Sequence, residues 1–197
     1  MRARLRTPAL FSAAGLIGFI ILRAAAVRRP RGAKGRKGCG GTPSSPHGLG
    51  ADAARRLDAA RQTVAGALGA RKERVLFTSG GTEANNLAIL GGAEARKRLG
   101  SRIVSTMTEH ASVHEPLMHL KKQGFEVVLL SPDRAGRFDE NEVLEAVTPD
   151  TILVSVIHTN NETGAYSPLE VFARAVARAG ERAKKKPLLH CDAVQGF

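Results

Sequence analysis

Beyond about residue 70, short apolar runs alternate along the chain with longer segments of helix-forming residues. The apolar runs are rich in β-branched and aliphatic residues, most clearly Thr151–Ile157, and have the length of strands. Near-continuous apolar strands separated by helices are typical of a parallel sheet with both faces covered. The pattern predicts an α/β fold with a mostly parallel sheet and helices on both faces. The predicted strands are residues 74–78, 102–105, 126–130, 151–157 and 187–191.

Capping and helix-breaking residues delimit the predicted helices. Asp139 is suited to an N-cap, with Glu142 three residues later, in front of a helix through Val147. Pro116 suits the first turn of a helix that runs to Gln123 and stops at Gly124. The other expected helices are residues 51–68, 83–99 and 169–182.

The formal net charge of +12 is unevenly distributed along the 197 residues. Residues 1–51 contain ten Lys and Arg residues and no Asp or Glu, which leaves 20 basic against 18 acidic residues in the remainder. A nucleic-acid-binding domain needs its basic stripe on the fold itself. We therefore expect no nucleic-acid partner, and we assign the excess charge to an N-terminal arm.

The arm, residues 1–41, has the composition of a leader. Its apolar stretch from Ala9 to Leu22 would be about 21 Å long as a helix, shorter than the roughly 30 Å hydrocarbon core of a bilayer. The composition of the arm is compatible with three interpretations: a targeting segment, a membrane anchor and an unstructured leader. We expect a mitochondrial or plastid location for a transit segment and a cytoplasmic one otherwise, with membrane contact through the arm alone. The domain is then expected at residues 42–197.

Polar clusters follow predicted strands at their carboxyl ends, where open α/β sheets bind ligands. The glycines and Thr82 before a predicted helix can bind a phosphate through backbone N–H groups, or they form a plain tight turn. Asp192 can hold a protonated ring nitrogen or a metal, or cap a helix, and His110 by itself is a weak signal. The clusters are Ser79–Thr82, Glu109–His110, His158–Glu162 and Asp192.

Metal-dependent and serine hydrolases are not indicated. Pro116 disfavours a helix that presents both His110 and His114, and the segment from His114 to His119 is one residue too long for H-E-x-x-H. There is no G-x-S-x-G segment. The two cysteines, Cys39 and Cys191, are too few for a four-cysteine zinc site. We predict no metal.

Taken in order, the polar clusters resemble the motifs of the cysteine desulfurase and selenocysteine lyase group of class V aminotransferase-like enzymes, which use pyridoxal 5'-phosphate (PLP). The resemblance covers roughly residues 40–197 and implies part of a PLP fold type I large domain. The central segment reads Phe-Thr-Ser-Gly-Gly-Thr-Glu-Ala-Asn-Asn-Leu-Ala. The matching segments are residues 43–47, 77–88, 108–110, 160–164 and 190–195.

The resemblance implies a cofactor contact for each of six residues. It also implies that a carboxylate keeps the pyridine nitrogen protonated, so that the ring can accept electrons from the substrate Cα. The implied roles are phosphate binding for Gly81 and Thr82, ring stacking and catalysis for His110, contact with the 3-hydroxyl side of the ring for Asn161 and Gln195, and pairing with the pyridinium nitrogen for Asp192.

The activity implied by the resemblance is transfer of sulfur from L-cysteine, as a persulfide, with alanine as the product, for iron–sulfur cluster or thio-cofactor supply. The implied partners are a sulfur-acceptor protein and, for the complete protein, a second copy in a homodimer. Selenocysteine lyase, acting on L-selenocysteine, shares the same motifs and stays an alternative, as does a non-catalytic interaction fragment of the fold.

Two features of the family are not matched. Its cofactor-binding lysine follows the position of Asp192 in a Ser-Gly-His-Lys segment, and its persulfide-forming cysteine lies in a C-terminal region; neither is found before Phe197. We expect Cys191 to be a buried strand residue with no sulfur-carrying role. The expectation is an N-terminal part of the large domain that does not turn over cysteine by itself.

Overall fold

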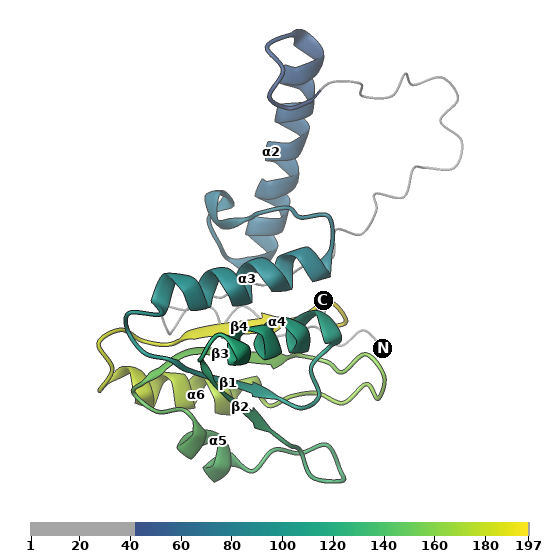
Figure 1. Ribbon diagram of the computed structural model, residues 1–197. Coiled ribbons are helices and arrows are strands. Elements are labelled where there is room, and N and C mark those ends of the chain that lie inside the picture. Colours follow the sequence, from purple (N-terminus) through teal and green to yellow (C-terminus); the bar gives the residue numbers. More distant parts are fainter. Residues whose placement is uncertain (1–41, 197) are drawn as a thin grey trace. The chain divides into compact units, whose positions relative to one another are not determined.

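The computed structural model describes residues 42–196, which form two compact units, residues 42–77 and 78–196 (Figure 1). The predicted leader, residues 1–41, lies outside the described residues, and so do the targeting and membrane roles considered for it. Among the residues described, no helix combines the length and the apolar character that a membrane crossing requires.

The first unit consists mainly of helix α2 (Gly48–Leu68). The His47 side chain caps its start by accepting from the Gly50 N–H at 3.3 Å, and Gly69 ends it in the left-handed conformation (φ 61°). After the short 3₁₀ helix η1 (Lys72–Arg74), residues 75–77 are irregular. The helix expected at residues 51–68 is confirmed.

The strand expected at residues 74–78 is wrong. Arg74 ends η1, and Val75–Thr78 form no strand. A strand is stabilised by ladder hydrogen bonds to a neighbour, and no described strand pairs with this segment. Its β-branched and aromatic residues give a preference for extended backbone, which alone does not make a strand.

The second unit is built on a parallel sheet with the strand order β2-β1-β3-β4. Every residue of β3 is buried, as expected for a central strand between two helical layers. The four remaining predicted strands are confirmed, each within one residue at its ends. They are β1 (Arg102–Thr106), β2 (Glu126–Leu130), β3 (Thr151–Ile157) and β4 (Leu188–Asp192).

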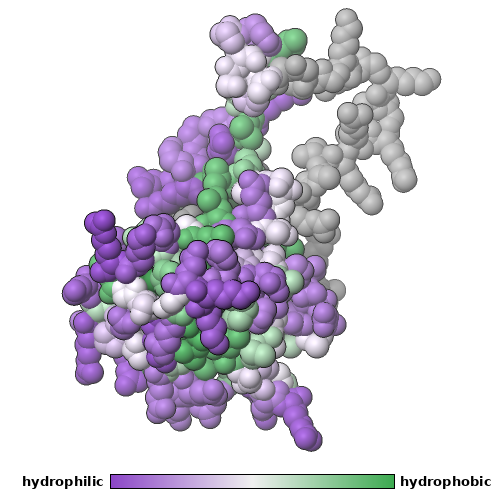
Figure 2. Space-filling model, in the orientation of Figure 1, coloured by the Kyte–Doolittle hydropathy of each residue, from purple (hydrophilic) through white to green (hydrophobic). Residues whose placement is uncertain are grey.

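Helices cover both faces of this sheet, as Figure 1 shows, which confirms the predicted α/β fold class. Successive residues of β3 face opposite sides: Leu153 packs with the cluster under α3 and α4, and Val154 with the cluster under α5 and α6. Hydrophilic residues dominate the surface in Figure 2, and hydrophobic residues are exposed between them. The helices are α3 (Gly81–Arg96), α4 (Ala111–Lys122), α5 (Glu140–Ala146) and α6 (Leu169–Gly180).

The start predicted for α5 is confirmed, and the start predicted for α4 is not. Asp139 caps α5 as predicted, since its Oδ1 accepts from the N–H groups of Asn141 (2.8 Å) and Glu142 (3.1 Å). The start predicted for α4 at Pro116 is wrong, because the helix begins at Ala111 with His110 as its N-cap. Pro116 lies buried inside the helix, where its missing N–H leaves one backbone hydrogen bond of the helix unmade.

Candidate cofactor site

The carboxyl edge of the sheet gathers the polar clusters that follow β1, β3 and β4. The chain leaves β1 for β2 on one side and returns to β3 on the other, so a topological switch point lies between β1 and β3, where open α/β sheets bind ligands. The remaining cluster, Ser79–Thr82, does not follow a strand. Its Gly81 nevertheless lies beside the turn after β4, because a Cβ on Gly81 would be 3.0 Å from Val194 Cγ2. The start of α3 therefore joins the same edge.

Asp192 ends β4 and is connected to His110 by hydrogen bonds through two buried residues. Asp192 is 4% exposed; its Oδ1 accepts from the Val194 N–H at 3.0 Å and its Oδ2 from Asn85 Nδ2 at 2.9 Å. Asn85 Nδ2 also donates to Ser112 Oγ at 2.8 Å, and Ser112 Oγ lies 2.8 Å from His110 Nδ1. The structure thus brings together two of the predicted site residues from β4 and the start of α4.

The N-terminus of α3 offers unpaired backbone donors. Its N-cap, Gly80, has no side chain, and the first N–H groups of a helix have no partner within the helix. The Glu83 carboxylate turns back to Ser79, accepting from its N–H and hydroxyl at 2.6 Å each, and the hydroxyl bond in particular lowers the pKa of Glu83. Thr82 and His110 both line an open pocket of about 570 Å³ between α3 and α4. The start of α3 therefore combines donors suited to an anion with proximity to His110.

The loop after β3 is held by Asn160 rather than by Asn161. The Asn160 Oδ1 accepts from the Glu162 and Thr163 N–H groups, and its Nδ2 donates to the Thr108 carbonyl at 3.0 Å. Asn161 is exposed, with no recorded hydrogen bond from its side chain within residues 42–196. The loop is therefore tied to the segment that leads into His110, and the role of Asn161 stays a prediction.

The turn after Asp192 packs closely on the loop after β3. A Cβ on Gly196 would collide with the His158 ring, whose Nδ1 contacts Thr159 Oγ1 at 2.8 Å. Gln195 lies in the same turn and is exposed, and its side chain makes no hydrogen bond to the described residues. Its role toward a ring hydroxyl also stays a prediction.

Glu109, for which the sequence predicted no role, has the most perturbed pKa of the acids at this edge. Its Oε1 accepts from Thr106 Oγ1 (2.9 Å) and from the Ile157 N–H (2.7 Å), and its buried Oε2 has no hydrogen-bond partner among the described residues. Burial, with a smaller contribution from the negative charge of Asp192, raises the pKa of Glu109 to about 7. A carboxyl that is partly protonated near neutral pH therefore lies between β1 and β3.

Two residues of β4 are kept neutral by burial. His190 is 1% exposed, with Nδ1 2.8 Å from Ser155 Oγ, and burial lowers its pKa to about 4. Cys191 lies in the strand as expected but is only partly buried; burial, followed by the charges of Glu109 and Asp192, raises the pKa of its thiol to about 12. Because the thiolate is the reactive form of cysteine, Cys191 is not an activated nucleophile.

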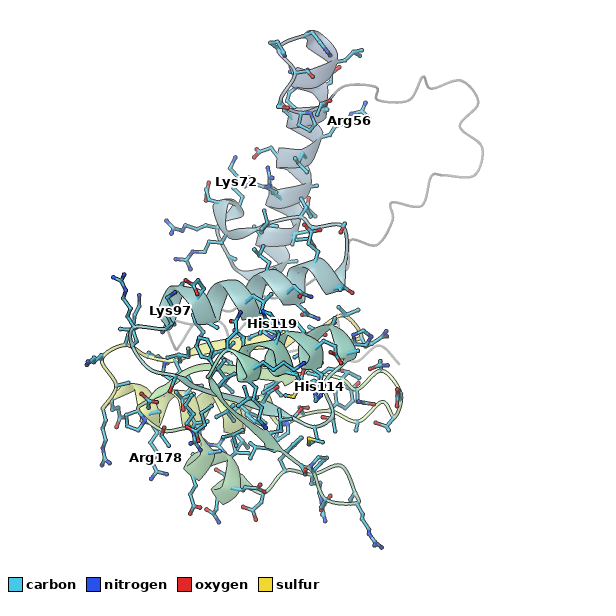
Figure 3. All side chains as sticks on the ribbon, viewed as in Figure 1. Arg56, Lys72, Lys97, His114, His119 and Arg178 are labelled. Carbon is cyan, nitrogen blue, oxygen red and sulfur yellow. The ribbon has the colours of Figure 1, made fainter. Side chains whose placement is uncertain are left out.

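Besides Glu109, the site residues whose roles were not predicted from the sequence are Asn85 and Ser112. Both are small polar residues within helices, and both contact partners far away in the sequence. In residues 42–196, no three His, Cys, Asp or Glu side chains are grouped as metal ligands. His114 and His119 lie on α4 (Figure 3), about 140° apart around the helix, and only His119 lines the pocket.

Comparison with known proteins identifies the family. The sequence model of Aminotransferase class-V matches residues 36–197. The chain belongs to the class V aminotransferase family. Cysteine desulfurase IscS of Anaeromyxobacter sp. (strain K) is 42% identical over 158 residues, which are 80% of this chain and 38% of that protein. The putative cysteine desulfurase IscS 1 of Bacillus subtilis (strain 168) is 43% identical over 158 residues, 80% of this chain and 40% of that protein.

Solved structures of this family share the fold. A NifS-like protein superposes with a TM-score of 0.76 at 34% identity, covering 82% of this chain and 43% of that one. SspA in complex with cysteine has a TM-score of 0.71 at 32% identity, covering 79% of this chain and 43% of that one. The chain thus spans about two fifths of the length of the proteins it matches.

Class V aminotransferases and cysteine desulfurases depend on PLP. The donor set at the sheet edge of this family member fits that cofactor: unpaired N–H groups and a hydroxyl suit a phosphate, and a buried carboxylate suits a protonated ring nitrogen. Asn85 Oδ1, buried without a partner in the described residues, adds an acceptor beside Asp192. The residues present therefore fit PLP at its phosphate and at its ring nitrogen.

Proposed function

We propose that this chain supplies the PLP-binding part of a cysteine desulfurase, in which L-cysteine yields L-alanine and its sulfur leaves as a persulfide for an acceptor protein. The observation that carries the proposal is the hydrogen-bonded connection from Asp192 to His110, at the edge where α3 begins. The cysteine desulfurases among the relatives, and a neighbour in complex with cysteine, support L-cysteine rather than L-selenocysteine as substrate.

The roles proposed for the residues follow from their charge and position. Bound PLP supplies an electron-accepting ring that stabilises negative charge at the substrate Cα. Asp192, held by two donors, holds the proton on the ring nitrogen. Thr82 and the first backbone N–H groups of α3, that of Gly81 included, would bind the phosphate; His110 would face the ring and give or take protons at its Nε2.

Asn161 and Gln195 are proposed to bind the 3-hydroxyl side of the ring. Both are exposed at the same sheet edge and have side chains that donate and accept. The printed sequence has no lysine after Lys186 and no Ser-Gly-His-Lys segment. We therefore propose that this chain by itself binds PLP reversibly and releases no alanine from cysteine.

The test is a titration of the full 197-residue chain with PLP, followed by absorbance and by equilibrium dialysis. We expect saturable binding, weakened at least tenfold in Asp192→Asn, because the amide does not hold a proton on the ring nitrogen as a carboxylate does. Asp52→Asn, on exposed α2, is the matched control and should bind as the parent does. Pyridoxal without its phosphate should bind at least tenfold more weakly.

Each competing function predicts a different result in the same assays. Equal binding by the parent and by Asp192→Asn would refute the site, and no binding at all would favour a non-catalytic interaction protein. Alanine released from L-cysteine by the chain alone would refute the proposed dependence on further residues. In a full-length relative, faster release from L-selenocysteine than from L-cysteine would favour the lyase.

The homodimer and the acceptor protein are proposals that follow from the family resemblance, and an organelle location is proposed only if residues 1–41 are a transit segment. Sedimentation of a full-length relative tests the dimer, which is proposed for the complete protein: a single monomeric species at micromolar concentration would contradict it. Fusion of residues 1–41 to a fluorescent protein tests the leader, and diffuse cytoplasmic fluorescence would contradict an organelle location.

A further inference from the structure

The orientation of the Asn85 side chain is determined by the charge beside it. A carboxylate only accepts hydrogen bonds, so the amide nitrogen of Asn85, and not its oxygen, faces Asp192 Oδ2 at 2.9 Å. The same nitrogen lies 2.8 Å from Ser112 Oγ. With two hydrogens available, Asn85 Nδ2 donates one to each partner, and Ser112 Oγ is therefore an acceptor toward Asn85.

The proton on the Ser112 hydroxyl is then free to point at His110. Ser112 Oγ lies 2.8 Å from His110 Nδ1, and the Ser112 backbone N–H donates to the same nitrogen at 3.1 Å. Two donors converge on Nδ1, so that nitrogen presents its lone pair. In the neutral imidazole, the proton then lies on Nε2.

We propose that Asn85 and Ser112 are positioning residues that fix His110 in its Nε2–H tautomer and tie the plane of its ring to Asp192. Asn85 is fully buried and Ser112 is 9% exposed, so water does not compete for these bonds, whereas His110 itself is exposed at the pocket. The chain of donors runs in one direction, from the Asn85 amide to Ser112 and on to Nδ1.

The consequence for chemistry is that a fixed nitrogen of His110 is available at the site. With Nδ1 engaged, Nε2 is the atom that gives and takes protons on the open side of the ring. This consequence rests on the proposed function, but the tautomer does not, because it is a property of the chain without PLP.

The test is ¹⁵N NMR of the full chain labelled at histidine, recorded without PLP, with the His110 signal assigned by its loss in His110→Gln. We expect Nε2–H in the parent. Ser112→Ala removes one of two donors to Nδ1, so the ratio of Nε2–H to Nδ1–H should fall about fivefold, and Ser112→Thr should restore it. Ser101→Ala, at an exposed serine before β1, is the matched control and should leave the ratio unchanged.

Several outcomes would overturn the proposal: Nδ1–H in the parent, an unchanged ratio in Ser112→Ala, or a fall that Ser112→Thr does not restore. If Ser112→Ala does not fold, the tautomer of the parent decides alone. PLP binding, measured on the same samples, separates the two proposals. The wrong tautomer in a chain that binds PLP refutes only the positioning role, and the expected tautomer in a chain that does not bind PLP refutes only the proposed function.

Discussion

Glu109 and His190 are predicted to have opposite effects on stability over the same pH range. The folded chain raises the pKa of Glu109 from 4.5 to about 7, chiefly by burial, so folding is progressively disfavoured as the pH rises from about 4.5 to 7. Burial lowers the pKa of His190 from 6.5 to about 4, so folding is disfavoured as the pH falls from about 6.5 to 4. Between about pH 4.5 and 6.5 the two slopes cancel.

Replacing one group removes that cancellation. Each shift of about 2.5 pH units corresponds to about 3 kcal/mol at 1.36 kcal/mol per unit. In Glu109→Gln, the oxygen that accepts from Thr106 and Ile157 is retained while the ionisation is lost. The free energy of unfolding of this variant, relative to the parent, should therefore rise by about 3 kcal/mol between pH 4.5 and 7.

His190→Asn should change in the opposite sense. It places a polar atom near the position of Nδ1, toward Ser155, and removes the group that the unfolded chain protonates at low pH. Relative to the parent, its free energy of unfolding should rise by about 3 kcal/mol as the pH falls from 6.5 to 4. Urea unfolding followed by circular dichroism at half-unit pH steps measures both differences. A difference that varies by less than 1 kcal/mol in either variant would refute the assigned protonation states.

Three further predictions concern packing, capping and thiol reactivity. Phe172→Ala removes a fully buried ring that packs edge-on against Phe138, with ring centroids 5.7 Å apart, and should lower the free energy of unfolding by about 3–5 kcal/mol in urea titrations. Asp139→Ala should cost about 1 kcal/mol through the lost cap of α5, and Asp139→Asn should recover most of it; equal losses would contradict the cap. Cys191 should be alkylated by iodoacetamide at pH 8 at least tenfold more slowly in the folded chain than in urea, as peptide mapping would show.

The sheet could be predicted from the sequence because three of its strands, β1, β3 and β4, are largely buried on both faces. In β3, every position is buried, so the strand is a continuous apolar run that stands out from its surroundings. The residues at 74–78 have similar composition, and what they lack is a neighbouring strand among the described residues, which no local pattern reveals. The start of α4 was missed because His110, an uncommon N-cap, replaces the residues that usually mark a helix start.

The candidate site was predictable at strand ends and at the start of α3, where Gly81 and Thr82 lie. Asp192 ends β4 and His110 follows β1, and the edge they share follows from the parallel order of the sheet. Asn85 and Ser112, which connect them, lie inside helices and act through contacts across 107 and 27 residues of sequence. The pKa of Glu109 depends on burial at the junction of β1 and β3, which the sequence does not state.

A crystal structure of the chain soaked with PLP tests the central claim most directly. We predict the phosphate at the N-terminus of α3, within hydrogen-bond distance of Thr82, and the ring nitrogen at Asp192 with the ring against His110. PLP bound with its phosphate away from α3, or with its ring nitrogen facing a residue other than Asp192, would contradict the account.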